Sequence, residues 1–232
     1  MQVNPVIYLH HITTETSLSE RAYHQIRRMI VRLDLEPGAV VREDELQITL
    51  GMGRTPIREA LQRLVRDQFV TVIARRGVFV SGIDVDELAT LYETRAIIEP
   101  YAARLACARG TTGHWDAMAL ALDRADRHGA PAIELLDIDR ECHELVWAAA
   151  NNRFLTDTLD MLYAQSDRLW HMYLAEVDDM ADAVAEHREI LGALRDSDGD
   201  RAAMLTEAHI RAFDAQIRTA VKRRLTSPLA GA

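Results

Sequence analysis

Four polar side chains with metal-binding chemistry fall on otherwise apolar helical stripes in the C-terminal part of the chain. Asp139 and His143 are four residues apart, so both point to the same side of one helix. His187 and His209 each lie on the apolar stripe of a later helical segment. One carboxylate and three imidazoles are therefore aimed at a common core, where an unpartnered buried polar group costs roughly 1–3 kcal/mol.

A divalent cation held by Asp139, His143, His187 and His209 would satisfy all four side chains together. Three histidines and one carboxylate suit zinc, our first expectation, with nickel, manganese or iron as alternatives. Such a set also leaves coordination positions for water or a ligand. The pattern leaves a second interpretation equally open, in which each histidine is hydrogen-bonded separately in the core.

An arginine is also directed inward. Arg95 shares a helical stripe with Leu88, Leu91 and Ile98, so its guanidinium should face the core. A buried cation needs an anionic partner. Glu99, one turn later, would make a structural ion pair, whereas a bound organic acid would make Arg95 a ligand-binding residue.

A second group of residues indicates nucleic-acid chemistry. Residues 54–76 hold six arginines against two acidic residues, in a chain whose formal net charge is −9. Two short helical patterns, 44–50 and 55–67, flank a Gly-Met-Gly break, which is typical of a helix-turn-helix. The first residues of the second helix, Arg54, Thr55 and Arg58, would then face base edges in the major groove.

The same module offers further DNA contacts. Arg63 continues along the second helix, and two β-prone segments, 69–73 and 78–80, flank a basic tip with Arg75, Arg76 and Gly77. This tip would form a wing that reaches the backbone or the minor groove. The alternative is an ordinary corner of two helices with solvated arginines.

The elements that must position these residues are mainly helical. A helix is predicted over 18–33, ended by Glu36-Pro37-Gly38, before the helix-turn-helix and the hairpin. Beyond residue 84 helical patterns follow one another with short breaks between them, which predicts an all-α bundle. Its helices are expected at 84–109, 113–128, 131–150, 153–176, 179–197 and 199–225.

This pattern predicts the domain organisation. We expect a flexible N-terminal tail, a winged helix-turn-helix domain, an all-helical metal- and ligand-binding domain and a C-terminal tail, over 1–17, 18–82, 83–226 and 227–232. The fold class is therefore mainly α.

The composition excludes several classes of protein. A chain of 232 residues that is 48% hydrophobic is not mostly disordered. No apolar run is long enough for a membrane span, no secretory signal is visible, and the two cysteines do not indicate a disulfide scaffold, so we expect a cytoplasmic protein. The charge is uneven: residues 1–83 carry 11 arginines and 9 acidic residues, whereas 84–232 carry 16 basic and 27 acidic residues.

The N-terminal segment resembles the winged helix-turn-helix of the GntR family. The resemblance covers residues 18–82 and is carried by Glu36-Pro37-Gly38, Glu43–Leu50, Arg54–Leu61, Arg63-Leu64 and Arg76–Val80. It implies DNA contacts at Arg54, Thr55, Arg58 and the wing around Gly77. Gly53 departs from the Ser or Thr usual in the family, and Asp44 stands where some members carry a DNA-contacting arginine.

The C-terminal segment resembles the FCD ligand-binding domain of the FadR subfamily of GntR regulators. Asp139-Arg-Glu-Cys-His143, then His187 and His209, match the three pieces of that domain's metal-binding pattern, and 92–103 resembles its first helix. The resemblance implies that Arg95 meets the carboxylate of a bound organic acid. Asn152 resembles an asparagine that follows the metal-ligand helix, and it either contacts the ligand or caps the next helix.

These expectations combine into one functional hypothesis with two rivals. The chain is expected to be a transcriptional regulator, more often a repressor in this family, that binds a palindromic double-stranded DNA operator as a homodimer and responds to a small carboxylate metabolite. One rival is a metal-dependent enzyme that activates water. The other is a bundle whose metal is purely structural and serves dimerisation.

Overall fold

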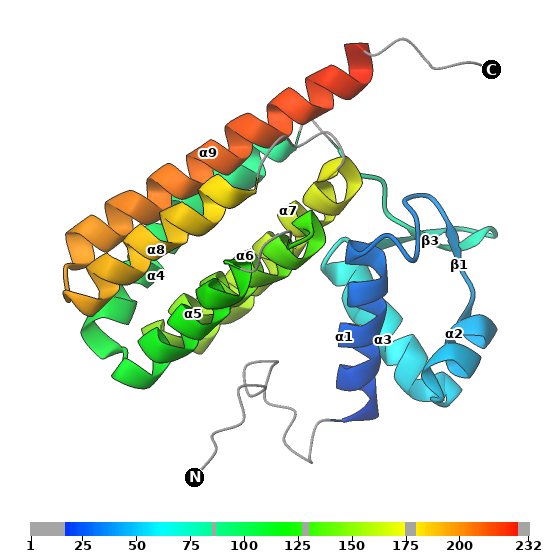
Figure 1. Ribbon diagram of the computed structural model, residues 1–232. Coiled ribbons are helices and arrows are strands. Elements are labelled where there is room, and N and C mark those ends of the chain that lie inside the picture. Colours follow the sequence, from blue (N-terminus) through cyan, green and yellow to red (C-terminus); the bar gives the residue numbers. More distant parts are fainter. Residues whose placement is uncertain (1–16, 85–86, 127–129, 175–179, 227–232) are drawn as a thin grey trace. The chain divides into compact units, whose positions relative to one another are not determined.

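The computed structural model describes residues 17–84, 87–126, 130–174 and 180–226 (Figure 1). The chain divides into two compact units at residues 84 and 85. Most of the two predicted tails lies outside the described residues. Ser17, predicted to belong to the first tail, is instead the N-cap of the first helix, where its hydroxyl accepts a hydrogen bond from the Glu20 backbone nitrogen at 3.2 Å.

The N-terminal unit is a three-helix winged helix-turn-helix. Its elements are α1 (Leu18–Val31), β1 (Val40–Val41), α2 (Glu43–Leu50), α3 (Arg54–Arg66), β2 (Val70–Ile73) and β3 (Gly77–Val80). Ile26, Ile30, Ile57 and Leu64 are completely buried and join α1 to α3 in one core. The three strands form an antiparallel sheet in the order β1-β3-β2.

Two glycines allow the sharp turns of this unit. Gly51 ends α2 with φ at 63°, and Gly77 opens β3 with φ at 112°, both in the region that side chains rarely adopt. The hairpin register pairs Ile73 with Gly77, so Arg75 and Arg76 lie in the connecting turn. β1 was not expected from the sequence, because two residues are too few to show an alternating pattern.

The C-terminal unit is a bundle of six described helices. They are α4 (Leu88–Arg109), α5 (Thr112–Ala125), α6 (Ala132–Ala150), α7 (Arg153–Tyr173), α8 (Ala181–Arg195) and α9 (Gly199–Thr226), and they run side by side in Figure 1. α4 packs against α6, α7 and α9, and α8 packs against α9, α5 and α6. None of the described helices is long and apolar enough to cross a membrane.

The breaks between these helices follow from their end residues. Asn151 adopts a left-handed conformation at φ 47° and ends α6, and the Asn152 side chain accepts a hydrogen bond from the Leu155 backbone nitrogen to begin α7. A capping box between Thr111 and His114 begins α5. These short connections fold α4, α6, α8 and α9 around one core, which brings the polar residues of the next section together.

Candidate functional site

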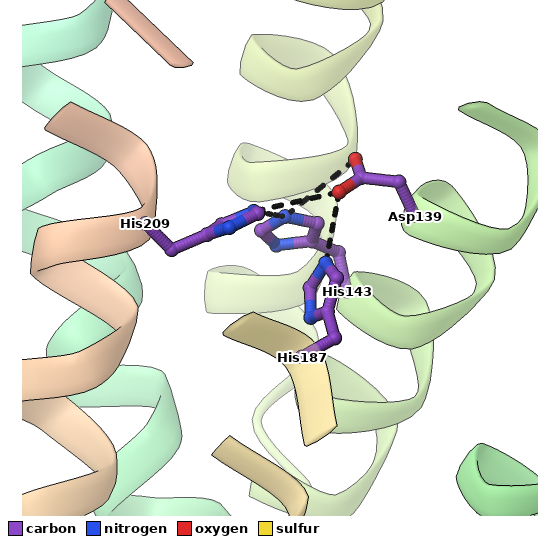
Figure 2. A group of neighbouring side chains, drawn as sticks. All are labelled: Asp139, His143, His187 and His209. Atoms are coloured by element: carbon purple, nitrogen blue, oxygen red, sulfur yellow. Dashed lines mark hydrogen bonds and ion pairs between the residues drawn. The ribbon is translucent and has the colours of Figure 1, made fainter. Parts of the chain in front are cut away.

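The four predicted metal ligands converge in the C-terminal unit. Asp139 and His143 project from α6, His187 from α8 and His209 from α9, and Figure 2 shows the three imidazoles turned toward the carboxylate. One candidate ligand atom from each lies within 4.8 Å of all the others, and all four residues are buried. The sequence expectation that they share one site therefore agrees with the structure.

The Nε2 atoms of all three rings face the centre of this cluster. His187 Nε2 lies 2.8 Å and His209 Nε2 3.4 Å from Asp139 Oδ1. His143 Nε2 lies 3.9 Å from Asp139 Oδ2 and 3.3 Å from His209 Nε2. The arrangement places three nitrogen atoms and one carboxylate close enough together to bind one metal ion.

Outer polar groups hold three of these side chains in place. Glu99 Oε2 lies 2.7 Å from His143 Nδ1, and Glu186 Oε2 lies 2.7 Å from His209 Nδ1. The hydroxyl of Tyr163 donates to Asp139 Oδ2 at 2.5 Å. Carboxylates behind ligating histidines fix the ring orientation in metal sites. Among the described atoms, the buried His187 Nδ1 has no hydrogen-bond partner.

The pKa shifts in the cluster follow from burial and from these contacts. Burial alone would raise the pKa of Asp139, but hydrogen bonds from His187 and His209 hold it well below its usual value. Burial and the charge of His209 lower the pKa of His187 to about 4. Burial disfavours the charged form of His209, yet its hydrogen bonds to Asp139 and Glu186 raise its pKa to about 9.

Arg95 lies in the core beside this cluster. Its Nε donates to Glu99 Oε1 at 2.6 Å, and one terminal nitrogen donates to Ser166 Oγ at 2.8 Å. Arg95 is 3% exposed and Glu99 1% exposed, so this is a buried ion pair, the structural alternative left open by the sequence. Glu99 therefore touches Arg95 with one oxygen and His143 with the other.

Two cavities border the cluster. One is lined by Glu99, His143 and His187 together with Trp147, and the other by Arg95, Asp139, Tyr163, Ser166 and Trp170, among others. Both therefore combine cluster residues with aromatic side chains.

Asn152, the second candidate ligand contact, and two polar residues nearby have structural contacts. The Asn152 side chain caps α7, which is one of the two roles expected for it from the sequence. Arg140 pairs with Asp167, which also lies 3.1 Å from His171 Nδ1. Sequence reasoning missed Tyr163, Ser166 and Glu186 as neighbours of the site. Glu186, adjacent to His187, was the only one with a local signal.

The predicted DNA-contact residues lie on the surface of the N-terminal unit. Arg54, Thr55 and Arg58 are exposed on the first turns of α3, and the apolar side of that helix is buried through Ile57 and Leu61. Arg75, Arg76 and Gly77 are exposed at the turn between β2 and β3. These six residues form two basic edges, one on the second helix of the helix-turn-helix and one on the wing.

Arg63 does not belong to either edge. Its guanidinium lies 4.1 Å from the centre of the Tyr23 ring and pairs with Glu20, both on α1. Five residues beyond Arg58, it is turned about 140° around the α3 axis, because each residue advances a helix by about 100°. The DNA contact expected at Arg63 therefore stays a prediction, and the contacts seen here support a packing role between α1 and α3.

Comparisons with known proteins identify both units. Residues 18–80 match the family model for bacterial regulatory proteins of the gntR family, and residues 90–212 match the FCD domain. The Nta operon transcriptional regulator of Aminobacter aminovorans is 31% identical over 85% of this chain and 93% of its own length. The HTH-type transcriptional repressor RspR of Escherichia coli is 25% identical over 89% of this chain and 94% of its own.

Solved structures share the fold. Escherichia coli McbR/YncC has a TM-score of 0.79 at 20% identity and covers 89% of this chain and 99% of its own. A GntR regulator from Rhodococcus sp. RHA1 has a TM-score of 0.70 at 24% identity, over 88% of this chain and 99% of its own. The family and these relatives are regulators, so the enzyme alternative is set aside. The chain belongs to the gntR family of bacterial regulatory proteins, and it is a DNA-binding transcriptional regulator with a C-terminal FCD domain.

Proposed function

We propose that this regulator is a homodimeric repressor whose affinity for a palindromic operator is set by a small organic acid bound in a metal-containing helical domain. The observation that carries the proposal is the buried convergence of Asp139, His143, His187 and His209. Family membership alone assigns DNA-binding regulation. The organic acid, the metal and the dimer are the parts that we propose in addition.

The donor atoms of the cluster suit a divalent cation. His209 Nδ1 is hydrogen-bonded to Glu186 Oε2 at 2.7 Å, and a carboxylate oxygen only accepts, so this Nδ1 carries a hydrogen. His143 Nδ1 lies 2.7 Å from Glu99 Oε2. A bound ion would replace the proton on the opposite Nε2, including the one that His209 carries at neutral pH, and the Nε2 atoms of His143 and His209 lie 3.3 Å apart beside Asp139. Ligand atoms about 2.0–2.1 Å from a zinc ion at tetrahedral angles are also about 3.3 Å apart.

The same four residues would hold the ion, with zinc first and nickel, manganese or iron as alternatives. A bound ion supplies positive charge that attracts the carboxylate of an effector. Glu99 and Glu186 orient two of the ligand rings, and Tyr163 orients the carboxylate of Asp139. The surrounding apolar residues, Trp147 and Ile190 among them, limit access of water.

Arg95 is the residue that we assign to the effector. The space lined by Arg95, Tyr163 and Ser166 has room for about one water molecule, so an organic acid that competed there with Glu99 for the guanidinium would have to displace side chains. Arg95 contacts Glu99, and Glu99 contacts His143. An exchange of partners at Arg95 would therefore shift α4 against α6. It changes operator affinity only if the acid binds the two arrangements unequally.

The remaining parts of the proposal concern DNA. Helix-turn-helix regulators commonly read two half-sites as dimers, which supports a homodimer on a palindromic operator. The relative RspR of Escherichia coli is an HTH-type transcriptional repressor, which supports repression here. The proposed DNA contacts are Arg54, Thr55, Arg58 and the wing residues Arg75, Arg76 and Gly77.

The DNA assignment is tested with Arg58→Ala. The operator is first obtained by selecting binding sequences from a random duplex pool with the full-length protein. We expect Arg58→Ala to weaken operator binding at least about tenfold, because a bidentate arginine–guanine contact contributes roughly 1–3 kcal/mol of discrimination. Arg66→Ala, which removes the same charge from the exposed last turn of α3, should have a much smaller effect. Equal losses in both variants would refute base reading by Arg58.

The metal assignment is tested by elemental analysis. Wild-type protein should contain one divalent ion per chain, and His187→Ala should lose it while His114→Ala, outside the cluster, retains it. An unchanged metal content in His187→Ala would remove the four-ligand site. Circular dichroism confirms that each variant is folded.

The effector assignment is tested with the metal-loaded protein and a panel of small carboxylates. We expect at least one acid to lower operator affinity in wild type, and to have no effect in Arg95→Gln/Glu99→Gln, which removes both charges of the buried pair. Because Glu99→Gln also weakens metal binding, the variant is assayed at a metal concentration at which elemental analysis shows full occupancy. If no acid acts but metal removal dissociates the dimer, the purely structural role of the metal is the better interpretation.

A further inference from the structure

Glu43 contacts two of the arginines assigned to DNA. It is the first residue of α2, whereas Arg54 begins α3 and Arg58 lies one turn further along. Arg58 Nε donates to both oxygens of Glu43, at 3.1 Å and 2.9 Å, and Arg54 Nε donates to Oε2 at 3.3 Å. The side chain of Glu43 is 29% exposed, against 66% for Arg54 and 53% for Arg58.

We propose that Glu43 determines DNA specificity by positioning the guanidinium of Arg58 for base reading. This inference rests on the proposed assignment of Arg58 to the DNA interface. A guanidinium is a rigid plane with five N–H groups. With Nε bound to Glu43, both terminal nitrogens remain available to donate to the two acceptors, O6 and N7, at a guanine edge.

Positioning before binding has an energetic consequence. A free arginine side chain samples many rotamers and loses that freedom when it contacts DNA. The contact from α2 to α3 restricts those rotamers in the unbound protein, so less entropy is lost on recognition. The restriction favours only those DNA sequences in which guanine O6 and N7 lie opposite the guanidinium of Arg58.

The same carboxylate opposes binding to DNA in general. A negative charge within reach of the phosphates weakens sequence-independent binding, which depends on the basic residues alone. Glu43 is therefore expected to lower the affinity for arbitrary DNA and to raise the affinity for the operator. These effects have opposite signs, and together they increase discrimination.

A simple masking role would behave differently. If Glu43 only occupied the arginines in the unbound protein, its neutralisation would increase the affinity for the operator and for arbitrary DNA alike. The positioning role predicts a loss at the operator instead.

Asp44 provides a matched control. It follows Glu43 in the same turn of α2 and is exposed, and no ion pair between it and Arg54 or Arg58 occurs among the described contacts. Asp44→Asn thus removes the same charge from almost the same place without removing the contact to Arg58.

The test uses full-length Glu43→Gln and Asp44→Asn, the selected operator, and a scrambled duplex of the same length and base composition. Fluorescence anisotropy gives both dissociation constants at two salt concentrations. We expect Glu43→Gln to reduce the ratio of scrambled to operator dissociation constants about tenfold, with weaker operator binding and equal or stronger scrambled binding. Asp44→Asn should strengthen both, and the ratio should fall much less than in Glu43→Gln, because the contact between Glu43 and Arg58 is retained.

A repeated selection locates the effect. Glu43→Gln should lose preference at the same guanine position that Arg58→Ala relaxes. An unchanged ratio in folded Glu43→Gln, or tighter operator binding, overturns the inference. If Arg58→Ala also keeps full operator affinity, the assignment of α3 to DNA fails as well, whereas a loss in Arg58→Ala alone refutes only the role of Glu43.

Discussion

At the scale of single residues, Glu99 connects two side chains to which different roles are proposed. One of its oxygens accepts from Arg95 and the other lies against the ring of His143. Although burial would raise the pKa of Glu99, Arg95 and His143 lower it to about 2, so the side chain is a carboxylate at neutral pH. A change at Arg95 would therefore reach His143, a proposed metal ligand, through one charged group.

Glu99→Gln is expected to weaken metal binding about 10–100-fold, because loss of an outer carboxylate lets the ligating ring reorient. Competition with a chromophoric chelator measures this affinity. Glu186→Gln should have a similar effect through His209, whereas the exposed Glu189→Gln on the same helix should have none. Metal affinity that is identical in wild type and Glu99→Gln would contradict the orienting role.

The four inner residues could be predicted from the sequence, but their outer partners could not. Asp139 and His143 share a helix face by spacing, and His187 and His209 interrupt apolar stripes. Tyr163 comes from α7, 24 residues beyond Asp139, and nothing in its local sequence indicates which carboxylate it meets. Such contacts depend on how α6 and α7 pack, which spacing within one helix does not define.

At the scale of elements, α1 and α3 are held together by an arginine that charge alone would assign to DNA. The guanidinium of Arg63 lies over the Tyr23 ring and pairs with Glu20, and it is only 35% exposed. Its charge predicts a DNA contact, whereas its angle around α3 and its contacts with α1 favour a packing role. The helix boundaries were easier to predict from the sequence, because glycines and capping residues mark them locally.

We expect Arg63→Ala to destabilise the N-terminal unit by about 1 kcal/mol, which combines a cation–π contact with a partly exposed ion pair. Urea denaturation followed by circular dichroism measures the change. At temperatures where the variant is folded, its operator affinity should stay within about threefold of wild type. A large loss of operator binding by a fully folded variant would return Arg63 to the DNA interface.

At the scale of the whole molecule, the two compact units differ in net charge and in the interactions that stabilise them. All four proposed metal ligands belong to the C-terminal unit, and the N-terminal unit is stabilised by its apolar core and its small sheet. The acidic surplus of residues 84–232 disfavours contact with DNA, which supports the arginine-rich edges as the proposed binding surface.

Metal removal should therefore affect one unit alone. A ligand at 100 times its dissociation constant stabilises the folded state by about 2.7 kcal/mol. In differential scanning calorimetry, a chelator is expected to lower the transition of the C-terminal unit by several degrees and to leave that of the N-terminal unit unchanged. Equal shifts of both transitions would indicate that the ion supports the chain as a whole.

The distribution of the four ligands along the chain also sets an order of events during synthesis. α6 and α8 leave the ribosome first, and His209 follows only with α9. Asp139, His143 and His187 therefore wait for the last helix before the set of donors is complete. A chain that terminates before α9 would therefore lack His209 and present only three of the four proposed ligands.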